Sequence, residues 1–376
     1  MEAAYLLQVA THISTRQLAS GFYLEFAAGM RNSKRENWAT DEVGRYDVAM
    51  ATRLDVRGLT VELPTAAGWV RPVNEVSFTL AEGETLGIVG ESGSGKTMLA
   101  LALMGLEPPG ARRKGEAWLR LRETAADRCA ENLVAAAPEE MRALRGREIA
   151  MIFQEPMTAL NPVMRIGPQV EEAIRVHEPG AAKGEIRRRA IESLARAAMP
   201  EPEVRARQYP HQLSGGLRQR VMIAMALAAG PRVLIADEPT TALDVTVQQQ
   251  ILDLLQKLRS ELQLSLLFIT HDLGVVAQIA SRVVVMYAGR IVEEGPAEEV
   301  LRKPRHPYTA GLLRAAPRLE RGKLVPIPGT VPALDSLPPG CAFAPRCERH
   351  VRECDSAVPE LRLVAPEHRA RCILDL

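Results

Sequence analysis

The residues best suited to chemistry form the octapeptide GESGSGKT, residues 90–97. It fits the pattern G-x-x-x-x-G-K-[ST], whose glycines let successive backbone N–H groups turn inward around a phosphate. Lys96 would reach the terminal phosphates, and the Thr97 hydroxyl would bind Mg²⁺. A chance Gly/Ser turn is the alternative, but a strand-like run precedes the octapeptide and a helical pattern follows it. The residues expected to contact a nucleotide here are Gly90, Glu91, Ser92, Gly93, Ser94, Gly95, Lys96, Thr97 and Met98.

Two carboxylates, Asp237 and Glu238, follow the apolar residues of the run RVLIADEP. A buried strand would deliver both at its carboxyl end, where open α/β sheets bind ligands. Asp237 would hold Mg²⁺ through water, and Glu238 would orient and polarise an attacking water as general base. A surface acidic pair at a strand end is the simpler interpretation, and the phosphate loop favours the catalytic one.

Four of the five cysteines, Cys341, Cys347, Cys354 and Cys372, lie near the C-terminus, with Cys129 alone elsewhere. No signal peptide is apparent, so we expect a cytosolic, reducing environment in which clustered cysteines indicate metal binding or redox chemistry before disulfides. Four thiolates suffice for a tetrahedral zinc site or a 4Fe-4S cluster. The spacings, C-x5-C-x6-C-x17-C, do not decide between them, and free buried cysteines are the third possibility.

Alternating strand and helix patterns would position these residues. ETLGIVG, RVLIADEP and SLLFIT are apolar, β-rich runs followed by helical patterns, which predicts a parallel sheet covered on both faces. MATRLDVRGLTVEL alternates apolar and polar residues as a half-buried strand does. Residues about 155–215 are helical in pattern and predict a helical insertion. Beyond about residue 300, proline and glycine increase, which predicts a loop-rich tail rather than more sheet.

The first 49 residues show no sustained period, and the regular pattern begins at Met50. We therefore expect Met50 to be the natural start and residues 1–49 to be an extension, disordered or not native. The charge balance, 47 Lys and Arg against 46 Asp and Glu, argues against a dedicated nucleic-acid binder. The longest uncharged apolar runs are far shorter than the roughly 20 residues that cross a bilayer.

Four further stretches give the chain a specific resemblance. LSGGLRQR, residues 213–220, resembles the signature of the ATP-binding cassette (ABC) ATPases, and Phe153-Gln154, Ala242-Leu243-Asp244 and Thr270-His271-Asp272 resemble that family's glutamine loop, aspartate loop and histidine switch. The resemblance covers about residues 50–320. It implies a P-loop NTPase with a mixed core sheet, an antiparallel β subdomain and a helical insertion, with the ATPase domain at residues 50–305.

The resemblance also implies roles for the matching residues. Two such domains face each other head to tail, so that each ATP lies between one phosphate loop and the other domain's signature. Ser214, Gly215 and Gly216 would contact the γ-phosphate of the partner's ATP, and Asp244 joins the expected nucleotide contacts. Gln154 would meet the metal and the attacking water, and His271 would bind the γ-phosphate. Adenine would stack on Trp69, although its register is shifted by one or two positions and a strand-end tryptophan packed on the sheet is the alternative.

Other stretches narrow the resemblance to the peptide/nickel importer ATPases. MIFQEPMTALNPVMRIGPQ, YPHQLSGG, HPYTAGLL and IPGTVPALDSLPPGCAFAPRC all resemble that subgroup, and residues 306–376 are expected to form its C-terminal region. Related ATPases carry a similar cysteine set interpreted as 4Fe-4S ligands, so the resemblance favours iron-sulfur over zinc.

The resemblance implies an assembly at the cytoplasmic face of a bacterial membrane. Its expected members are two permease subunits, a second ATPase subunit that forms a heterodimer with this chain, and an extracellular or periplasmic solute-binding protein. The segment at residues 156–168 would form part of the groove for a permease coupling helix. No nucleic-acid partner is expected. The competing class is a soluble, non-transport ABC ATPase acting on ribosomes or DNA, which usually carries two fused cassettes or a long coiled-coil insertion.

Overall fold

The computed structural model describes residues 52–66, 68–121, 130–155, 159–316 and 326–374. The expected extension at residues 1–49, its boundary at Met50, and Cys129 lie outside these ranges. Residues 48–376 form one compact unit, described below. Within the described ranges, no helix has both the length and the apolar character needed to cross a membrane.

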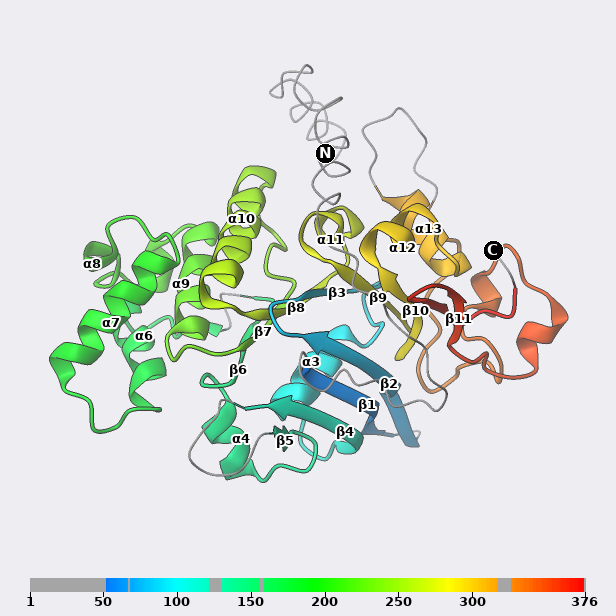
Figure 1. Cartoon of the computed structure of the whole chain (residues 1–376), viewed down its shortest axis with the longest axis horizontal. Helices are drawn as coiled ribbons and strands as arrows, with labels where there is room; N and C mark the ends of the chain where they lie inside the picture. Colours follow the sequence, from blue (N-terminus) through cyan, green and yellow to red (C-terminus); the bar gives the residue numbers. More distant parts are fainter. Residues whose placement is uncertain (1–51, 67, 122–129, 156–158, 317–325, 375–376) are drawn as a thin grey trace, which may run out of the picture. The chain divides into compact units, whose positions relative to one another are not determined.

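An eight-stranded sheet forms the centre of this unit, in the order β11-β12-β10-β9-β3-β8-β7-β6 (Figure 1). Five neighbouring strands are parallel: β9 (Arg282–Tyr287), β3 (Thr85–Val89), β8 (Ser265–Thr270), β7 (Val233–Asp237) and β6 (Ile149–Ile152). Strands β3, β6, β7 and β8 are buried along their whole length, as expected for parallel strands covered on both faces. The predicted parallel strands are therefore confirmed.

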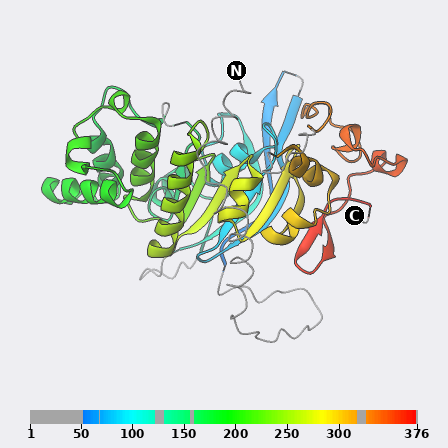
Figure 2. The same cartoon turned by 90° about the horizontal axis from the view of Figure 1, so that it is seen from above.

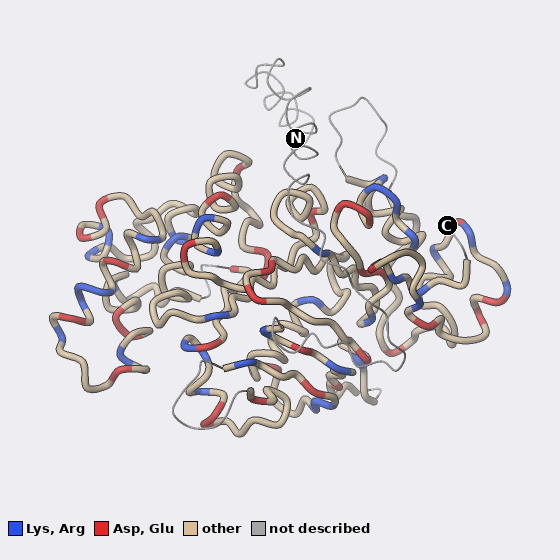
Figure 3. Tube along the Cα trace, in the orientation of Figure 1, with Lys and Arg blue, Asp and Glu red and all other residues tan. Residues whose placement is uncertain are grey.

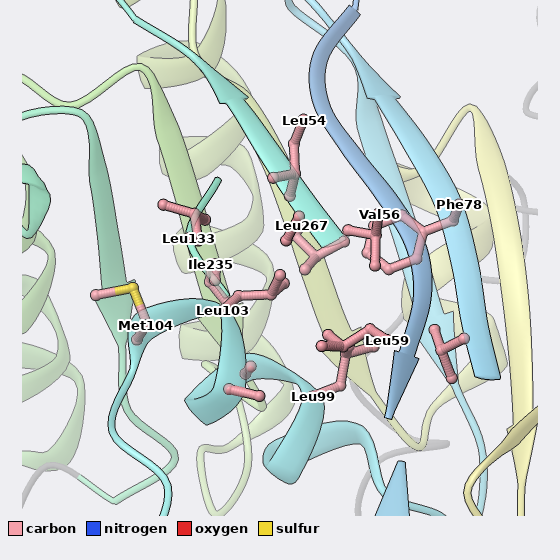
Figure 4. Close-up of a cluster of buried hydrophobic side chains, with 14 of the residues drawn as sticks. Leu54, Val56, Leu59, Phe78, Leu99, Leu103, Met104, Leu133, Ile235 and Leu267 are labelled. Carbon is pink, nitrogen blue, oxygen red and sulfur yellow. The ribbon is translucent and has the colours of Figure 1, made fainter. Parts of the chain in front are cut away.

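One face of this sheet carries α3 and a second sheet. Four antiparallel strands, in the order β2-β1-β4-β5, form the second sheet: β1 (Thr52–Thr65), β2 (Gly68–Ala81), β4 (Arg112–Arg120) and β5 (Ala130–Asn132). Helix α3 (Lys96–Met104) lies between the sheets, so that Leu99 and Leu103 pack between Leu59 on one side and Ile235 and Leu267 on the other (Figure 4). Helix α4 (Pro138–Leu144) adds Met141 to this core.

Helices cover the opposite face. Side chains alternate along a strand, so Leu234 and Ala236 of β7 join this second core, whereas Val233 and Ile235 join the first. The helices α9 (Gly215–Leu227), α10 (Val245–Leu262) and α11 (Leu273–Ile279) contribute to this core. The helices α6 (Ile166–Arg175) and α7 (Lys183–Arg196) extend it to the side of the sheet by packing on α9 (Figure 1). Between β6 and β7, the described elements are all helical and include α8 (Pro202–Arg205) and the 3-10 turn η2 (Pro210–Gln212).

The C-terminal residues add strands to the core sheet. Beyond β10 (Arg290–Pro296), the chain forms α12 (Ala297–Arg302), α13 (Pro307–Ala315) and the 3-10 turns η3 (Ala344–Arg346) and η4 (Arg352–Asp355). It then returns as β11 (Arg362–Ala365) and β12 (His368–Ala370), and β12 pairs antiparallel with β10 (Figure 2). The expectation of a tail that adds no sheet is wrong, because the outer edge of β10 offers backbone groups with which the short strand β12 pairs, and β11 then pairs with β12.

Candidate nucleotide-binding site

The phosphate loop joins β3 to α3 and is held in shape by Lys96. The ammonium group of Lys96 donates hydrogen bonds to the carbonyl oxygens of Gly90 (2.7 Å) and Glu91 (2.9 Å). Burial lowers the pKa of Lys96, although nearby carboxylates oppose the shift. Gly95 has a φ of 102°, and a Cβ there would lie 2.0 Å from the carbonyl oxygen of Pro72. The loop therefore requires glycine at this position.

Asp237 ends β7 with its carboxylate buried and unpaired. The residue is 1% exposed, and neither carboxylate oxygen has a hydrogen-bond partner. Burial raises the pKa of Asp237 to about 6, and the nearby Thr97 hydroxyl acts in the opposite direction. Neither carboxylate oxygen, however, accepts a hydrogen bond from that hydroxyl. A buried, unpaired carboxylate beside a hydroxyl suits a hard cation such as Mg²⁺, which prefers oxygen ligands. The residues present fit the predicted metal.

Glu238 gathers the other predicted catalytic residues. Its Oε2 atom accepts hydrogen bonds from the Gln154 side-chain amide (3.2 Å) and the Thr241 hydroxyl (2.8 Å), and lies 3.2 Å from Nδ1 of His271. The His271 hydrogen bond is the largest influence holding the pKa of Glu238 below its usual value, and the same contact raises the pKa of His271. Three loops thus converge on one carboxylate at the carboxyl edge of β6, β7 and β8.

The signature lies at the start of α9. Ser214 caps this helix, and its hydroxyl accepts a hydrogen bond from the Leu217 N–H (3.4 Å). A Cβ at Gly216 would lie 2.5 Å from Val247, so glycine allows α9 and α10 to pack closely. Asp244 caps α10 through a 2.9 Å hydrogen bond from the Val247 N–H. Helix α9 contacts β6, which lies three strand positions from β3, a separation of about 14 Å at ordinary strand spacing.

Trp69 lies near the start of β2 with 45% of its surface exposed. The guanidinium carbon of Arg112 lies 3.9 Å from the centre of the indole. Pro72, three residues further along β2, is the residue that approaches Gly95 of the phosphate loop. An exposed aromatic ring on the strand that borders the loop is compatible with the expected adenine contact.

Two residues at the site were missed from the sequence. The Glu91 N–H donates to the Tyr308 hydroxyl (2.7 Å), and the Glu91 carboxylate binds the Arg346 guanidinium. Glu91 was expected to contact nucleotide, but its N–H and its carboxylate are both engaged by C-terminal residues. HPYT and PRC were visible in the sequence as family markers, but nothing in their local pattern connects them to a loop more than 200 positions away.

The tail cysteines do not form a ready metal site. Cys354 and Cys372 are buried, whereas Cys341 and Cys347 are partly buried. Burial raises the pKa of the Cys341, Cys347 and Cys372 thiols, which opposes the thiolate form that binds metals. Within the described ranges, no group of three or more His, Cys, Asp or Glu residues is arranged to hold a metal ion. The arrangement of the described residues therefore supports neither the 4Fe-4S cluster nor the zinc ion.

Two family descriptions match this chain. The one described as ABC transporter matches residues 73–241, and the one described as oligopeptide/dipeptide transporter, C-terminal region, matches residues 292–354. The second match contains both Tyr308 and Arg346.

Individual proteins agree with these matches. A protein of Brucella melitensis, named for peptide import and ATP binding, is 53% identical over 331 residues, covering 85% of this chain and 96% of the relative. The oligopeptide transport ATP-binding protein OppD of Mycobacterium bovis is 48% identical over 327 residues, covering 86% of this chain and 52% of OppD. A solved ATP-binding cassette, described as a dimer in a post-hydrolysis state bound to ADP and Pi, shows 29% identity and a TM-score of 0.56, covering 65% of this chain and 98% of that one. The chain belongs to the ATP-binding proteins of ABC transporters, in the oligopeptide/dipeptide import family.

Proposed function

We propose that this chain is the ATP-hydrolysing subunit of an importer for di- or oligopeptides, with nickel-like solutes as the alternative cargo. The observation that carries the proposal is the convergence of Gln154, Thr241 and His271 on Glu238, at the sheet edge that also carries the phosphate loop. The names of the relatives support peptides as the cargo.

Hydrolysis would use the residues gathered at this edge. Glu238, whose lowered pKa keeps it ionised at neutral pH, would accept a proton from the water that attacks the γ-phosphate. His271 would contact the γ-phosphate, and Gln154 would orient the water. Bound Mg²⁺ would neutralise phosphate charge, held by Thr97, by Gln154 and, through water, by Asp237. Gln154 and His271 would then exchange their contacts with Glu238 for contacts at the bound nucleotide.

The signature would serve a second ATPase subunit. Ser214, Gly215 and Gly216 start a helix that packs beside β6, whereas the phosphate loop follows β3. The dimeric state of the solved cassette supports a site shared between two subunits. The proposed assembly contains a heterodimeric ATPase pair, two permease subunits and a solute-binding protein on the far side of the membrane. Residues 159–168, the described part of the proposed coupling groove, would face a permease.

Replacing Glu238 with glutamine tests the proposed hydrolysis. Glu238→Gln keeps the shape and the hydrogen bonds of the side chain but removes the base, so we expect turnover to fall by about 100-fold or more. The dissociation constant for a non-hydrolysable ATP analogue should stay near that of the wild type. Lys96→Ala, the contrasting variant, should weaken analogue binding itself. Near-normal turnover in Glu238→Gln would reject the assigned role.

Purification from the native host distinguishes a transporter subunit from a soluble, non-transport ABC ATPase. Over the described residues, acidic and basic positions are interspersed along the chain (Figure 3), a pattern that favours neither partner class. A transporter subunit should co-purify with two multi-span permeases from solubilised membranes. Co-purification with ribosomes or DNA instead would favour the alternative class.

The iron-sulfur assignment stays a prediction. A 4Fe-4S cluster would be held by the thiolates of Cys341, Cys347, Cys354 and Cys372. Brown protein with matching iron and sulfide content after anaerobic purification would support the cluster. Colourless protein with one zinc per chain would select zinc, and metal-free protein would reject both.

A further inference from the structure

Glu91 in the phosphate loop is held by two residues from the C-terminal region. Its carboxylate accepts two hydrogen bonds from Arg346, from Nη1 to Oε2 (2.7 Å) and from Nη2 to Oε1 (3.0 Å). Its backbone N–H donates to the Tyr308 hydroxyl at 2.7 Å. Its carbonyl oxygen accepts a hydrogen bond from Lys96. Every polar group of this one loop residue therefore has a protein partner, and two of the partners lie more than 200 positions away.

Contacts other than the one with Glu91 also hold the Arg346 side chain in place. It ends the turn η3, is 7% exposed, and donates through Nε to the Pro328 carbonyl oxygen (2.9 Å). A second contact joins Nη1 to the Tyr287 hydroxyl (3.4 Å). The bidentate contact with Glu91 is the main cause of a raised Arg346 pKa. A pre-oriented, buried guanidinium fork is well suited to hold a carboxylate in one geometry.

Tyr308 is equally constrained. Its ring is fully buried and packs against Tyr287, with ring centroids 4.6 Å apart, and against Phe343, with centroids 5.4 Å apart. Burial raises the pKa of Tyr308 far above the physiological range, so its hydroxyl stays neutral. Phe343 belongs to the same tail segment as Arg346, so one small core supports both contacts to Glu91.

The charge of Glu91 gives these contacts a consequence for nucleotide binding. A carboxylate in a loop that receives a triphosphate repels the ligand unless a nearby positive charge neutralises it. Lys96 belongs to the loop itself, and its ammonium group is needed for the phosphates. Arg346 supplies the missing neutralisation without using Lys96. Tyr308 fixes the direction of the peptide group between Gly90 and Glu91, whose carbonyl oxygen contacts Lys96.

We propose that Arg346 and Tyr308 are positioning residues for nucleotide: they hold the phosphate loop in its binding-ready shape and mask the charge of Glu91. The inference deepens the proposed ATPase function and rests on it for the identity of the ligand. It predicts that the C-terminal region sets the affinity for ATP rather than the rate of the chemical step.

The test measures binding of a non-hydrolysable ATP analogue and, separately, KM and kcat for ATP. Arg346→Met removes the charge but keeps most of the volume. We expect the dissociation constant for the analogue and the KM for ATP each to rise about tenfold, with kcat at saturating ATP within about twofold of wild type. Adding Glu91→Gln to this variant removes the unmasked carboxylate, so affinity should recover to within about threefold of wild type. The matched control is Arg314→Met, which breaks an exposed ion pair with Glu348 in the same region and should leave both constants unchanged.

The double variant separates charge masking from simple support of the tail. If the double variant binds the analogue as weakly as Arg346→Met, Arg346 acts only by holding the tail, and the proposal is overturned. Wild-type affinity in Arg346→Met also overturns it. If Arg346→Met does not fold, Tyr308→Phe decides: it removes only the hydroxyl that receives the Glu91 N–H and should weaken analogue binding severalfold, whereas a wild-type constant would reject the proposal. Analogue binding needs no hydrolysis, so these outcomes do not depend on the Glu238→Gln result.

Discussion

At the scale of single residues, Asp237 and Glu238 are adjacent but have opposite environments. Asp237 is buried without partners, which raises its pKa to about 6. Glu238 is bound by His271 and Thr241, which lowers its pKa. Neighbouring carboxylates with pKa values shifted in opposite directions are typical of sites that assign different chemical roles to the two groups. The raised value of Asp237 also has a direct effect on stability.

Asp237→Asn should stabilise the nucleotide-free, Mg²⁺-free protein at neutral pH. In the unfolded chain Asp237 ionises near its ordinary pKa of 3.8, whereas in the folded chain it stays protonated up to about pH 6. Its contribution to stability is therefore complete below pH 3.8 and is lost as the pH rises to about 6. Asparagine never ionises, so at pH 7 the variant should gain about 3 kcal/mol in the free energy of unfolding.

Urea denaturation of wild type and Asp237→Asn from pH 4 to pH 7 measures this difference. Asp253→Asn, on the exposed face of α10, is the control, because it makes the same chemical change at an exposed position. A parallel arm with Mg²⁺ and the ATP analogue should stabilise the wild type more than Asp237→Asn, because the carboxylate then gains a cationic partner. A difference that stays constant from pH 4 to pH 7 would contradict the assigned burial effect.

At the scale of elements, Glu293 joins the C-terminal strands to helix α13. Its carboxylate lies at the centre of β10 with no exposed surface and accepts backbone hydrogen bonds from Arg305 and His306, at the start of α13. It also contacts the buried His368 of β12 at 2.7 Å. Tyr308 follows two residues after His306, so this one carboxylate helps to place the helix that reaches the phosphate loop.

Glu293→Ala should therefore be strongly destabilising. The change leaves the His368 ring and the two backbone N–H groups buried without their acceptor, and we expect a loss of about 3–5 kcal/mol in the free energy of unfolding. Chemical denaturation measures the loss. Glu298→Ala breaks an exposed ion pair with Arg302 on the neighbouring α12 and should cost less than about 1 kcal/mol. Equal losses in the two variants would show that Glu293 does not connect these elements.

The elements also show what the sequence could reveal. Strands β3, β7 and β8 were predicted because continuous apolar runs and the glycine loop are local signals. Strands β11 and β12 were missed because they have four and three residues, too few to show a period, and are specified by the open edge of β10. The contact of Arg346 with Glu91 spans 255 positions and follows from tertiary packing alone. The residues of the nucleotide motifs were predictable, whereas their supports from the C-terminal region were not.

At the scale of the whole molecule, we propose that the described site is half of a site shared between two ATPase subunits. The phosphate loop, Asp237 and Glu238 lie along β3, β8 and β7, whereas Ser214 starts a helix beside β6. ATP bound at the loop would leave this signature free for a second ATPase subunit. In this arrangement, a mutation at Ser214 should affect ATP-dependent dimerisation without affecting ATP binding at the chain's own phosphate loop.

Ser214→Arg in the Glu238→Gln background tests that separation. Because this background cannot hydrolyse ATP, the ATP-bound closed pair should accumulate. That pair consists of this chain and its cognate ATPase subunit, or of two copies of this chain if the pair is homodimeric. A bulky cation at Ser214 should block this pairing because it fills the space required by the partner's γ-phosphate. The affinity of the isolated chain for the analogue should change by less than about twofold, since loss of the α9 cap costs only about 1 kcal/mol of stability.

Light scattering after size exclusion, with and without ATP, measures pairing, and analogue titration measures binding. Weaker analogue binding by the isolated variant would place the signature in its own chain's site and contradict the shared arrangement.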